Sequence, residues 1–169
     1  FVQEYDKFFT VAKDAKIQVT FDPVFVDSYR LIGYENRVLA DAEFENDTVD
    51  AGEIGASQTI TALYQVIPKG QSSGSFGSME FRYKKPGMDQ SRLLVQSLDN
   101  SRSEFPVSTE NMRFAASLSG FGMLLKNSDY KGSLSYDQVR QWASEARSFD
   151  PYGYREEYVH LIDKVKNLD

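Results

Sequence analysis

Hydrophobic and polar residues alternate with a period of two in several runs between Lys16 and Pro106, and apolar residues recur at helical spacing after Pro106. Alternation is typical of strands that bury one face. It predicts strands over residues 16–21, 24–34, 36–40, 58–67, 78–84 and 92–98. Turn-rich stretches separate these strands, and one of them, Pro68–Gly77, predicts a flexible hairpin tip.

Beyond Pro106, apolar residues recur every three or four positions, as in helices with one apolar face. These residues form three stripes: Phe114, Leu118, Phe121 and Leu125; then Tyr136, Val139, Trp142, Ala143 and Ala146; then Tyr154, Tyr158, Leu161, Ile162 and Val165. Ser135 and Gln138 have the spacing of a capping box at the start of the second helix. We expect Phe114, Phe121 and Trp142 to be buried, some of them against strand residues such as Ile32 or Leu63.

Strands grouped first and helices grouped later favour an α+β fold, with an antiparallel β-sandwich-like part followed by a C-terminal helical part. Helical spacing over residues 1–15 predicts a junction helix from an upstream domain. Residues 16–169 are then expected to form a single accessory domain, β-rich over 16–105 and helical over 106–169. Because no long linker separates the two parts, we predict that they unfold together.

Composition excludes several classes of function. A net charge of −6 and a sequence pI near 4.9 disfavour nucleic acid and anionic membranes as partners, since both attract basic surfaces. The chain has no cysteine, which excludes disulfides, thiolate zinc sites and a cysteine nucleophile. The single histidine, His160, lies on the third predicted helix between Val159 and Leu161, where a surface or boundary position is favoured over a catalytic triad. We predict no catalytic residue, no cofactor and no enzymatic activity.

Acidic residues are concentrated between Asp41 and Glu53, with no basic residue among them. Carboxylate oxygens are the ligands of Ca²⁺, so Asp47, Asp50 and Glu53 are candidates for a metal site. Their spacing does not match a calcium-binding helix–loop–helix, and a solvated connection between strands is the preferred interpretation. A small-ligand or Ca²⁺-binding module is the alternative function. A carbohydrate-active enzyme comes third, because nothing in the sequence selects a pair of carboxylates.

Several glycines predict local backbone geometry. Gly120 and Gly122, which follow Ser117 within the first helical stripe, predict close packing of that helix, and the order of residues does not match a serine nucleophile elbow. Gly33 predicts a bulge or a close backbone approach. Gly52 and Gly55 predict a shaped loop with positive φ angles.

A set of linked motifs extends over nearly the whole chain. The most distinctive is Tyr-Arg-Leu-Ile-Gly-Tyr-Glu-Asn-Arg at residues 29–37. The others, in the same fixed order, occupy residues 12–19, 50–56, 61–64, 121–126 and 153–155. In order and spacing the set resembles the C-terminal domain of bacterial von Willebrand factor type A domain-containing proteins.

The resemblance implies a noncatalytic accessory or interaction domain that supports an upstream von Willebrand factor A domain of the same chain, with other envelope proteins as further partners. It implies a place in the cell envelope, outside the cytoplasm, with any lipoprotein signal N-terminal to Phe1, so we expect the chain to be part of a longer protein without a membrane span here. The family's metal-ion-dependent adhesion site would lie upstream. The interface or scaffold candidates are Arg30, Gly33, Tyr34, Glu35, Asn36 and Arg37.

Overall fold

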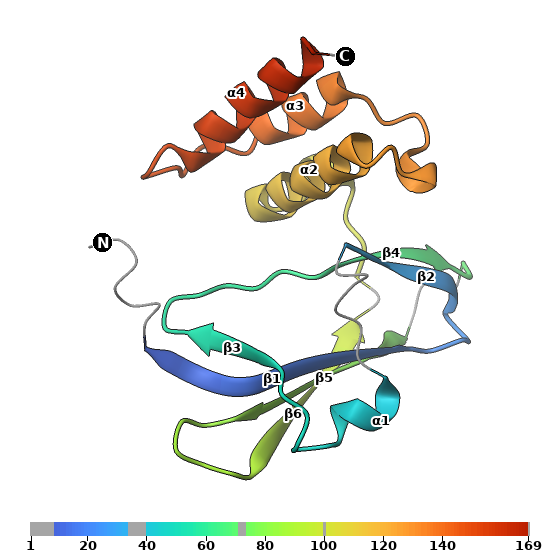
Figure 1. The fold of residues 1–169 in the computed structure, drawn as a ribbon. Helices are drawn as coiled ribbons and strands as arrows, with labels where there is room; N and C mark the ends of the chain where they lie inside the picture. The colour runs from blue at the N-terminus through green and yellow to red at the C-terminus, as the bar shows by residue number, and fades with distance from the viewer. Residues whose placement is uncertain (1–8, 34–39, 71–73, 100, 169) are drawn as a thin grey trace. The chain divides into compact units, whose positions relative to one another are not determined.

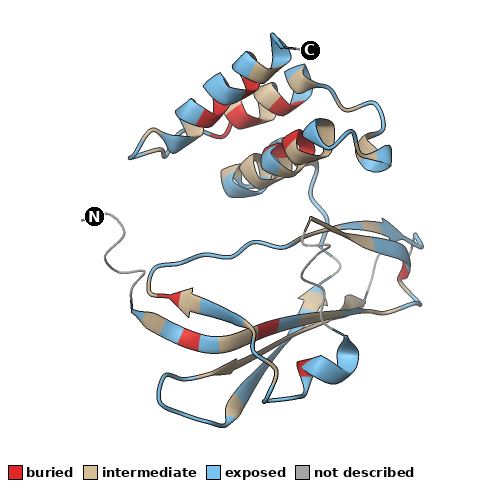
Figure 2. Ribbon diagram, viewed as in Figure 1, coloured by how far each residue is buried: buried red, intermediate tan, exposed pale blue. Residues whose placement is uncertain are grey.

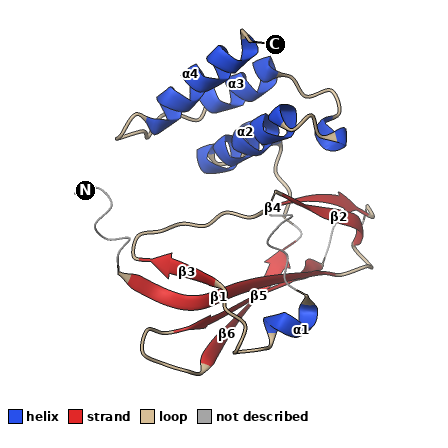
Figure 3. Cartoon of the chain, viewed as in Figure 1, coloured by secondary structure: helices blue, strands red, loops and turns tan. Residues whose placement is uncertain are grey.

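The computed structural model describes residues 9–33, 40–70, 74–99 and 101–168 (Figure 1). The chain divides into two compact units, Phe1–Ser101 and Arg102–Asp169, hereafter the sheet unit and the helical unit. Antiparallel strands precede helices along the chain (Figure 3), which confirms the predicted α+β fold. Whether the two units unfold together stays a prediction.

A four-stranded antiparallel sheet dominates the sheet unit, in the order β3-β1-β5-β6. Its strands are β1 (Thr10–Phe21), β3 (Gly52–Gly55), β5 (Ser75–Lys84) and β6 (Ser91–Asp99). Strands β5 and β6 extend the predicted strands 78–84 and 92–98 by a few residues at their ends. Strand β1 pairs with β3 on one side and with β5 on the other, so it lies inside the sheet.

A second antiparallel sheet has two strands, β2 (Val26–Ile32) and β4 (Leu63–Pro68). The ring of Phe21, at the end of β1, packs 4.5 Å from Tyr29 of β2 and 5.5 Å from Tyr64 of β4 between ring centroids. Aromatic contacts of this kind add to the burial of apolar area. The two sheets therefore meet at the end of β1.

The helix predicted over residues 1–15 is wrong where the structure describes it, because β1 begins at Thr10. Residues 1–8 lie outside the described residues. The misleading signal has a physical cause: the register shifts between Lys13 and Lys16, where Asp14 has a φ of +49°. A bulge inserts an extra residue into one strand, so the strict alternation of inward and outward positions is interrupted between Lys13 and Lys16.

The segment predicted as a strand over 58–67 forms a strand only from Leu63, and most of the strand predicted over 36–40 lies outside the described residues. The predicted glycine loop is instead strand β3, in which neither Gly52 nor Gly55 has a positive φ. Positive φ falls on Ser57, next to a turn in which the Gln58 side chain accepts a hydrogen bond from the Gly55 amide. The turn therefore comes after the glycines, and it delays the next strand.

The predicted hairpin tip joins β4 to β5, and residues 71–73 of it lie outside the described residues. Its last residue, Gly77, belongs to β5 and has a φ of +144°. A Cβ at this position would lie 1.9 Å from the Thr20 carbonyl oxygen, so only glycine fits where β5 approaches β1.

Three α-helices and two short 3₁₀ segments form the helical unit: η3 (Phe105–Val107), α2 (Glu110–Leu125), η4 (Asp129–Lys131), α3 (Tyr136–Ser144) and α4 (Tyr154–Lys166). The predicted capping box is confirmed, because the Ser135 hydroxyl accepts from the Gln138 amide and the Gln138 side chain accepts from the Ser135 amide. Thr109 caps α2 by accepting from the Met112 amide. Each cap satisfies an amide that the first turn leaves unpaired.

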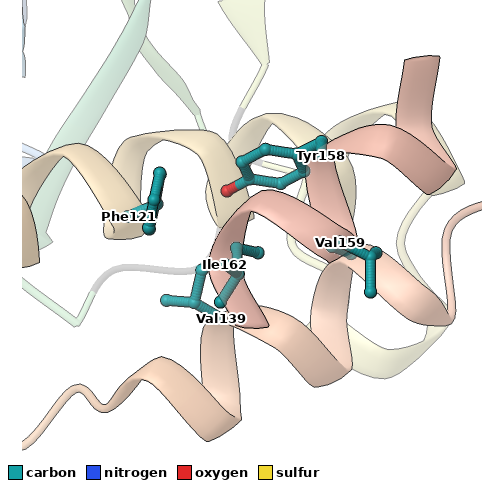
Figure 4. Packing of buried hydrophobic residues seen from close by; sticks show 6 residues of the cluster. Phe121, Val139, Tyr158, Val159 and Ile162 are labelled. Atoms are coloured by element: carbon teal, nitrogen blue, oxygen red, sulfur yellow. The ribbon is translucent and has the colours of Figure 1, made fainter. Parts of the chain in front are cut away.

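The core of the helical unit lies where α2, α3 and α4 meet (Figure 4). Its buried members come from all three helices: Phe121, Val139, Ala143, Tyr158, Val159 and Ile162. The predicted stripes are right in part, since Leu118, Leu125, Tyr154 and Leu161 are exposed. Trp142 is half-buried and packs 4.8 Å from the Phe105 ring, so the expectation of a fully buried tryptophan is wrong.

The face of α2 that is buried explains this difference. Ser117, Gly120 and Phe121 are the buried residues of α2, so two small side chains, not two leucines, mark its contact line. A Cβ on Gly120 would lie 2.9 Å from Leu134 Cδ2 and 3.0 Å from Val139 Cγ2, which confirms its predicted packing role. The same prediction is wrong for Gly122, whose Cβ would meet nothing within 4 Å.

Candidate interaction surfaces

The acidic segment is anchored to the four-stranded sheet. It forms the short helix α1 (Asp41–Phe44), whose Phe44 is buried, and a turn that leads to β3. Lys16 of β1 is only 3% exposed, and its ammonium donates to the carbonyls of Glu43 (2.9 Å) and Asn46 (2.6 Å). A cation at the carbonyl end of a helix is favourable. The lysine therefore holds the segment against β1, while all its acidic residues are exposed, in agreement with the predicted solvated connection between strands.

Two further cations of the sheet, on β5, hold the same segment. Lys84 lies 2.8 Å from the Asp14 carboxylate and donates to the Asp47 carbonyl at 2.7 Å. Arg82 donates to the Ser91 hydroxyl at 2.8 Å and lies 3.9 Å from the Asp47 carboxylate. The hydrogen bond from Lys84 lowers the pKa of Asp14, and hydrogen bonds from Ser91, helped by the nearby cations, lower the pKa of Asp47.

The three metal candidates do not converge. The Asp47 carboxylate faces Ser91 and Arg82, whereas Glu53 accepts from the Thr10 hydroxyl at 3.2 Å and lies 3.8 Å from the Lys13 ammonium. Asp50 is exposed between them. Among the residues that the structure describes, no group of three or more His, Asp or Glu side chains is placed to hold a metal ion.

Two of the interface or scaffold candidates lie within the described residues. Arg30 donates from Nε (3.3 Å) and Nη2 (2.8 Å) to the side-chain oxygen of Gln65, directly across the β2–β4 pair. Gly33 has a φ of +75° and open space around the position of a Cβ, so it permits a left-handed backbone and makes no close approach. Tyr34, Glu35, Asn36 and Arg37 lie outside the described residues.

The residues weighed for nucleophilic chemistry have structural surroundings. Ser117 is fully buried, and its hydroxyl donates to the Val139 carbonyl at 2.8 Å and lies 3.2 Å from the Tyr158 hydroxyl. Burial raises the pKa of Tyr158 to about 12, so the phenol stays neutral inside the core. His160 is exposed on α4, as predicted. The serine and the histidine belong to different environments.

The segment that connects α3 to α4 carries exposed aromatic side chains, which the sequence pattern did not reveal. Phe149, Tyr152 and Tyr154 are 75%, 60% and 59% exposed, and we call residues 148–154 the aromatic loop. The rings of Tyr152 and Tyr154 lie 5.9 Å apart with a tilt of 43°. The sequence pattern predicts only a turn at Asp150-Pro151. The number of large aromatic residues on both sides of that turn was the signal that could have indicated an exposed aromatic surface.

Hydrogen bonds fix the backbone of the aromatic loop at both ends. The Asp150 carboxylate accepts from the Glu156 amide at 3.0 Å, and the Gly153 amide donates to the Asp150 carbonyl at 3.2 Å. At the other end, the amide and the hydroxyl of Ser148 both donate to one carboxylate oxygen of Glu110, at 3.2 and 2.7 Å. Gly153 provides the left-handed turn with a φ of +74°. The rings are thus presented on an ordered backbone.

No helix in the described parts of the chain is long and apolar enough to span a membrane. Comparison with known proteins gives one family, described as "Uncharacterized protein YfbK, C-terminal", which matches residues 6–80 and 69–168. The chain is also similar to "Uncharacterized protein YfbK" of Escherichia coli (strain K12), with 36% identity over 179 residues. That alignment covers 91% of this chain and 30% of the relative, so the chain spans less than a third of the relative's length. No solved structure matches.

Proposed function

Since the chain belongs to the family of YfbK C-terminal domains, we propose that it is a noncatalytic interaction domain that supports a von Willebrand factor A domain upstream in the same protein. The relative is much longer than this chain, which leaves room for further domains in that protein. The motifs around Arg30 and Gly33 favour the von Willebrand factor A architecture. We place the protein in the cell envelope, outside the cytoplasm, with any lipid anchor upstream.

The aromatic loop is the observation that carries this proposal. Exposed Phe and Tyr side chains lose apolar contact with water when a partner covers them, and rigid aromatic residues dominate the energetics of many protein interfaces. Phe149, Tyr152 and Tyr154 are exposed together, on a backbone that the Asp150 and Glu110 carboxylates hold. Little ordering entropy is therefore lost when this loop binds.

The geometry favours a protein partner over a sugar or a metal ion. Tyr152 and Tyr154 are tilted by 43°, so their rings do not form one flat platform for a sugar ring. The alternative Ca²⁺ function has no supporting contact, because Asp47 and Glu53 face cationic side chains. A curved or pocketed protein surface can cover two tilted rings and the neighbouring Phe149.

Calorimetric titration of this chain into the separately produced upstream part of its own full-length protein tests the proposal. We expect binding, weakened about 30-fold by Phe149→Ala or Tyr152→Ala if either ring is an interface hot spot worth 2 kcal/mol. The matched control is Tyr130→Ala, which removes another exposed ring of the helical unit. No heat of binding would overturn the proposed function. Equal losses in Phe149→Ala and Tyr130→Ala would show that the aromatic loop is not its surface.

A further inference from the structure

The acidic segment lies across one face of the four-stranded sheet as a strap, which we define as residues 40–51. Its partners on the sheet come from three strands: Lys16 and Gln18 of β1, Arg82 and Lys84 of β5, and Ser91 of β6. The Gln18 side-chain amide donates to the Asp41 carboxylate at 3.0 Å, and the Ser91 backbone amide donates to the Asp47 carboxylate at 3.4 Å. The strap therefore crosses the sheet from β1 to β6.

Three cations lie on the face of the sheet that the strap covers. Lys16 is opposite Arg82 in the β1–β5 pair, and Lys84 is two residues further along β5. Directly opposed residues, and alternate residues of one strand, share a face of a sheet, so all three side chains belong to the same face. Lys16 is buried, and the side chains of Arg82 and Lys84 are mostly covered. The strap thus shields a group of cations from water.

The strap and the face beneath it carry opposite charges. The strap contains five acidic residues and no basic one: Asp41, Glu43, Glu45, Asp47 and Asp50. The acidic side chains near the cations on the rest of the sheet unit are Asp14, Glu80 and Asp89. The guanidinium of Arg82 and the carboxylate of Asp47 are 3.9 Å apart, well within the Debye length of about 8 Å at physiological salt. Charge therefore favours the closed position of the strap at neutral pH.

Apolar packing contributes little to the attachment of the strap. Among residues 40–51, all of which the structure describes, Phe44 alone is buried. Its ring centroid lies 5.5 Å from the guanidinium carbon of Arg82, so even this residue contacts a cation. The backbone pairing of β1 with β5 and of β5 with β6 does not include the strap. The strap can therefore leave the sheet without breaking those strand pairs.

We propose that the strap is an acid-released latch, which covers this face of the sheet at neutral pH and detaches below about pH 4 while β1, β5 and β6 stay paired. Detachment exposes Phe44 and the three cations, so this face of the sheet is open only in acid. The inference concerns the sheet unit and does not rest on the proposed function of the aromatic loop.

Two carboxylates at the latch, Asp47 of the strap and Asp14 of β1, explain the response to acid. The groups that face them are the cations Arg82 and Lys84, the carboxyl of Asp50, and the amides of Ala51 and Ser91. These contacts lower the pKa of both carboxyls, so their stabilisation is complete above the unfolded pKa and is lost as pH falls through the folded pKa. Acid also neutralises the neighbouring carboxylates, whereas the three cations keep their charge. Repulsion among the cations then replaces the attraction between strap and sheet.

The first test follows the backbone amide resonances of the whole 169-residue chain by NMR from pH 7 to pH 3. We expect the amides of residues 41–51 to reach random-coil chemical shifts at a higher pH than the amides of β1 and β5, because the strap leaves while the strands stay paired. Strap amides that keep their neutral-pH shifts at the acid end of the titration would overturn the proposal. So would loss of the strap, β1 and β5 at one common pH.

The second test weakens the latch at neutral pH, where the carboxylates are charged. Lys16→Met removes the ammonium that donates to the carbonyls of Glu43 and Asn46, and it keeps a long side chain at this buried position. A glutamate-specific protease should then cut after Glu43 and Glu45 about tenfold faster than in the unsubstituted chain, because cleavage needs a detached strap. Mass spectrometry of the fragments identifies the sites that are cut.

The matched control is Lys13→Met on the same strand, because the Lys13 ammonium lies 3.8 Å from Glu53, which is outside the strap. This variant should leave cleavage in the strap unchanged. Cleavage after Glu156 and Glu157 of α4 reports opening of the helical unit and should not change in either variant. Unchanged strap cleavage in Lys16→Met, an equal increase in both lysine variants, or a parallel increase in α4 would each show that the strap is not a separate latch.

Discussion

The helical unit and the sheet unit bury their apolar residues to very different extents (Figure 2). In the helical unit, Val139, Ala143 and Ile162 are completely inaccessible. In the described part of the sheet unit, the buried side chains are few and scattered along the chain: Ala12, Lys16, Val26 and Phe44. One of these four is a lysine, held by backbone carbonyls. The helical unit is stabilised mainly by packing, and the sheet unit by its strand ladders and ionic contacts.

The difference in burial between the two units follows from how helices and sheets cover their apolar faces. Three helices can enclose a core among themselves when small residues lie at their contacts. Gly120 and Ala143 are such residues here. A single sheet layer buries a face only if a second layer covers it. The two-stranded sheet reaches the end of β1 through Phe21, whereas Ile17 and Leu94 stay about half-exposed. The sheet unit therefore leaves these apolar residues partly exposed.

The largest expected effect comes from truncating the helical core. Ile162→Ala should lower the free energy of unfolding by about 2–5 kcal/mol, because it opens a cavity at a completely buried position. Ile17→Ala, at a half-exposed position of β1, should cost only about 1 kcal/mol. Urea unfolding followed by the fluorescence of Trp142, the one tryptophan of the chain, measures the effect on the helical unit.

Ile162→Ala also tests the sequence-based prediction that both units unfold together. A sheet unit with so few buried side chains is marginal alone, so we expect faster amide exchange in β1 and β5 as well as in α2. Hydrogen exchange followed by mass spectrometry separates these segments. Faster exchange confined to the helices would show that the units unfold independently. Equal costs for Ile162→Ala and Ile17→Ala would contradict the comparison itself.

Two glycines of α2, two residues apart, test the packing argument in opposite directions. Gly120→Ala should destabilise by about 1–3 kcal/mol, since the new methyl group would press on Leu134 and Val139. Gly122→Ala should stabilise by about 0.5–1 kcal/mol, because alanine favours the helix and finds open space. Thermal unfolding of the two variants checks the signs. Stabilisation by both substitutions would mean that helix propensity, not close packing, governs this helix.

The polar groups inside the helical core should contribute less to stability than Ile162 does. Ser117→Ala removes the donor to the Val139 carbonyl and a neighbour of the Tyr158 hydroxyl, and should cost about 1–3 kcal/mol. Tyr158→Phe should cost about 1 kcal/mol. Chemical denaturation of both single variants and the double variant gives their coupling. Because the two groups share one interaction, the double variant should cost less than the sum, and strict additivity would contradict the hydrogen bond.

The sequence predicted the class of fold because alternation and helical spacing report burial directly. Strands β2, β5 and β6 and the cap at Ser135 follow from those patterns. The bulge at Asp14 broke the alternation, so the start of β1 was interpreted as a helix. The acidic residues of segment 41–53 are exposed, as the sequence predicts, but its contacts with Lys16 and Lys84 could not be predicted because these cations are far away in sequence. Ion pairs between residues far apart in sequence produce no local sequence pattern. Exposed aromatic residues in a loop follow no helical or strand periodicity.

The smallest expected effect concerns acid stability in the ionic contacts of the sheet unit. The pKa of Asp14 is lowered in the folded state, so its pair with Lys84 stabilises fully above the unfolded pKa of the carboxyl and is lost as pH falls through the folded pKa. Asp14→Asn should therefore lower stability near neutral pH and flatten the loss of stability below about pH 4. Asparagine tolerates the positive φ of this position, so the bulge should survive.

The matched variant in the helical unit is Asp163→Asn. Its carboxylate accepts from Arg140 at 2.5 and 3.1 Å, and this contact lowers the pKa of Asp163 in the same direction. Each pair should account for part of the acid-induced loss in its own unit. Unfolding free energies measured from pH 2 to pH 7, with Trp142 fluorescence for the helices and exchange at β1 and β5 for the sheet, separate the two contributions. If packing dominates the helical unit, Asp163→Asn should change its stability by a smaller fraction than Asp14→Asn changes that of the sheet unit. The reverse order would mean that ionic contacts matter more where the core is well packed, and the contrast between the two units would have to be abandoned.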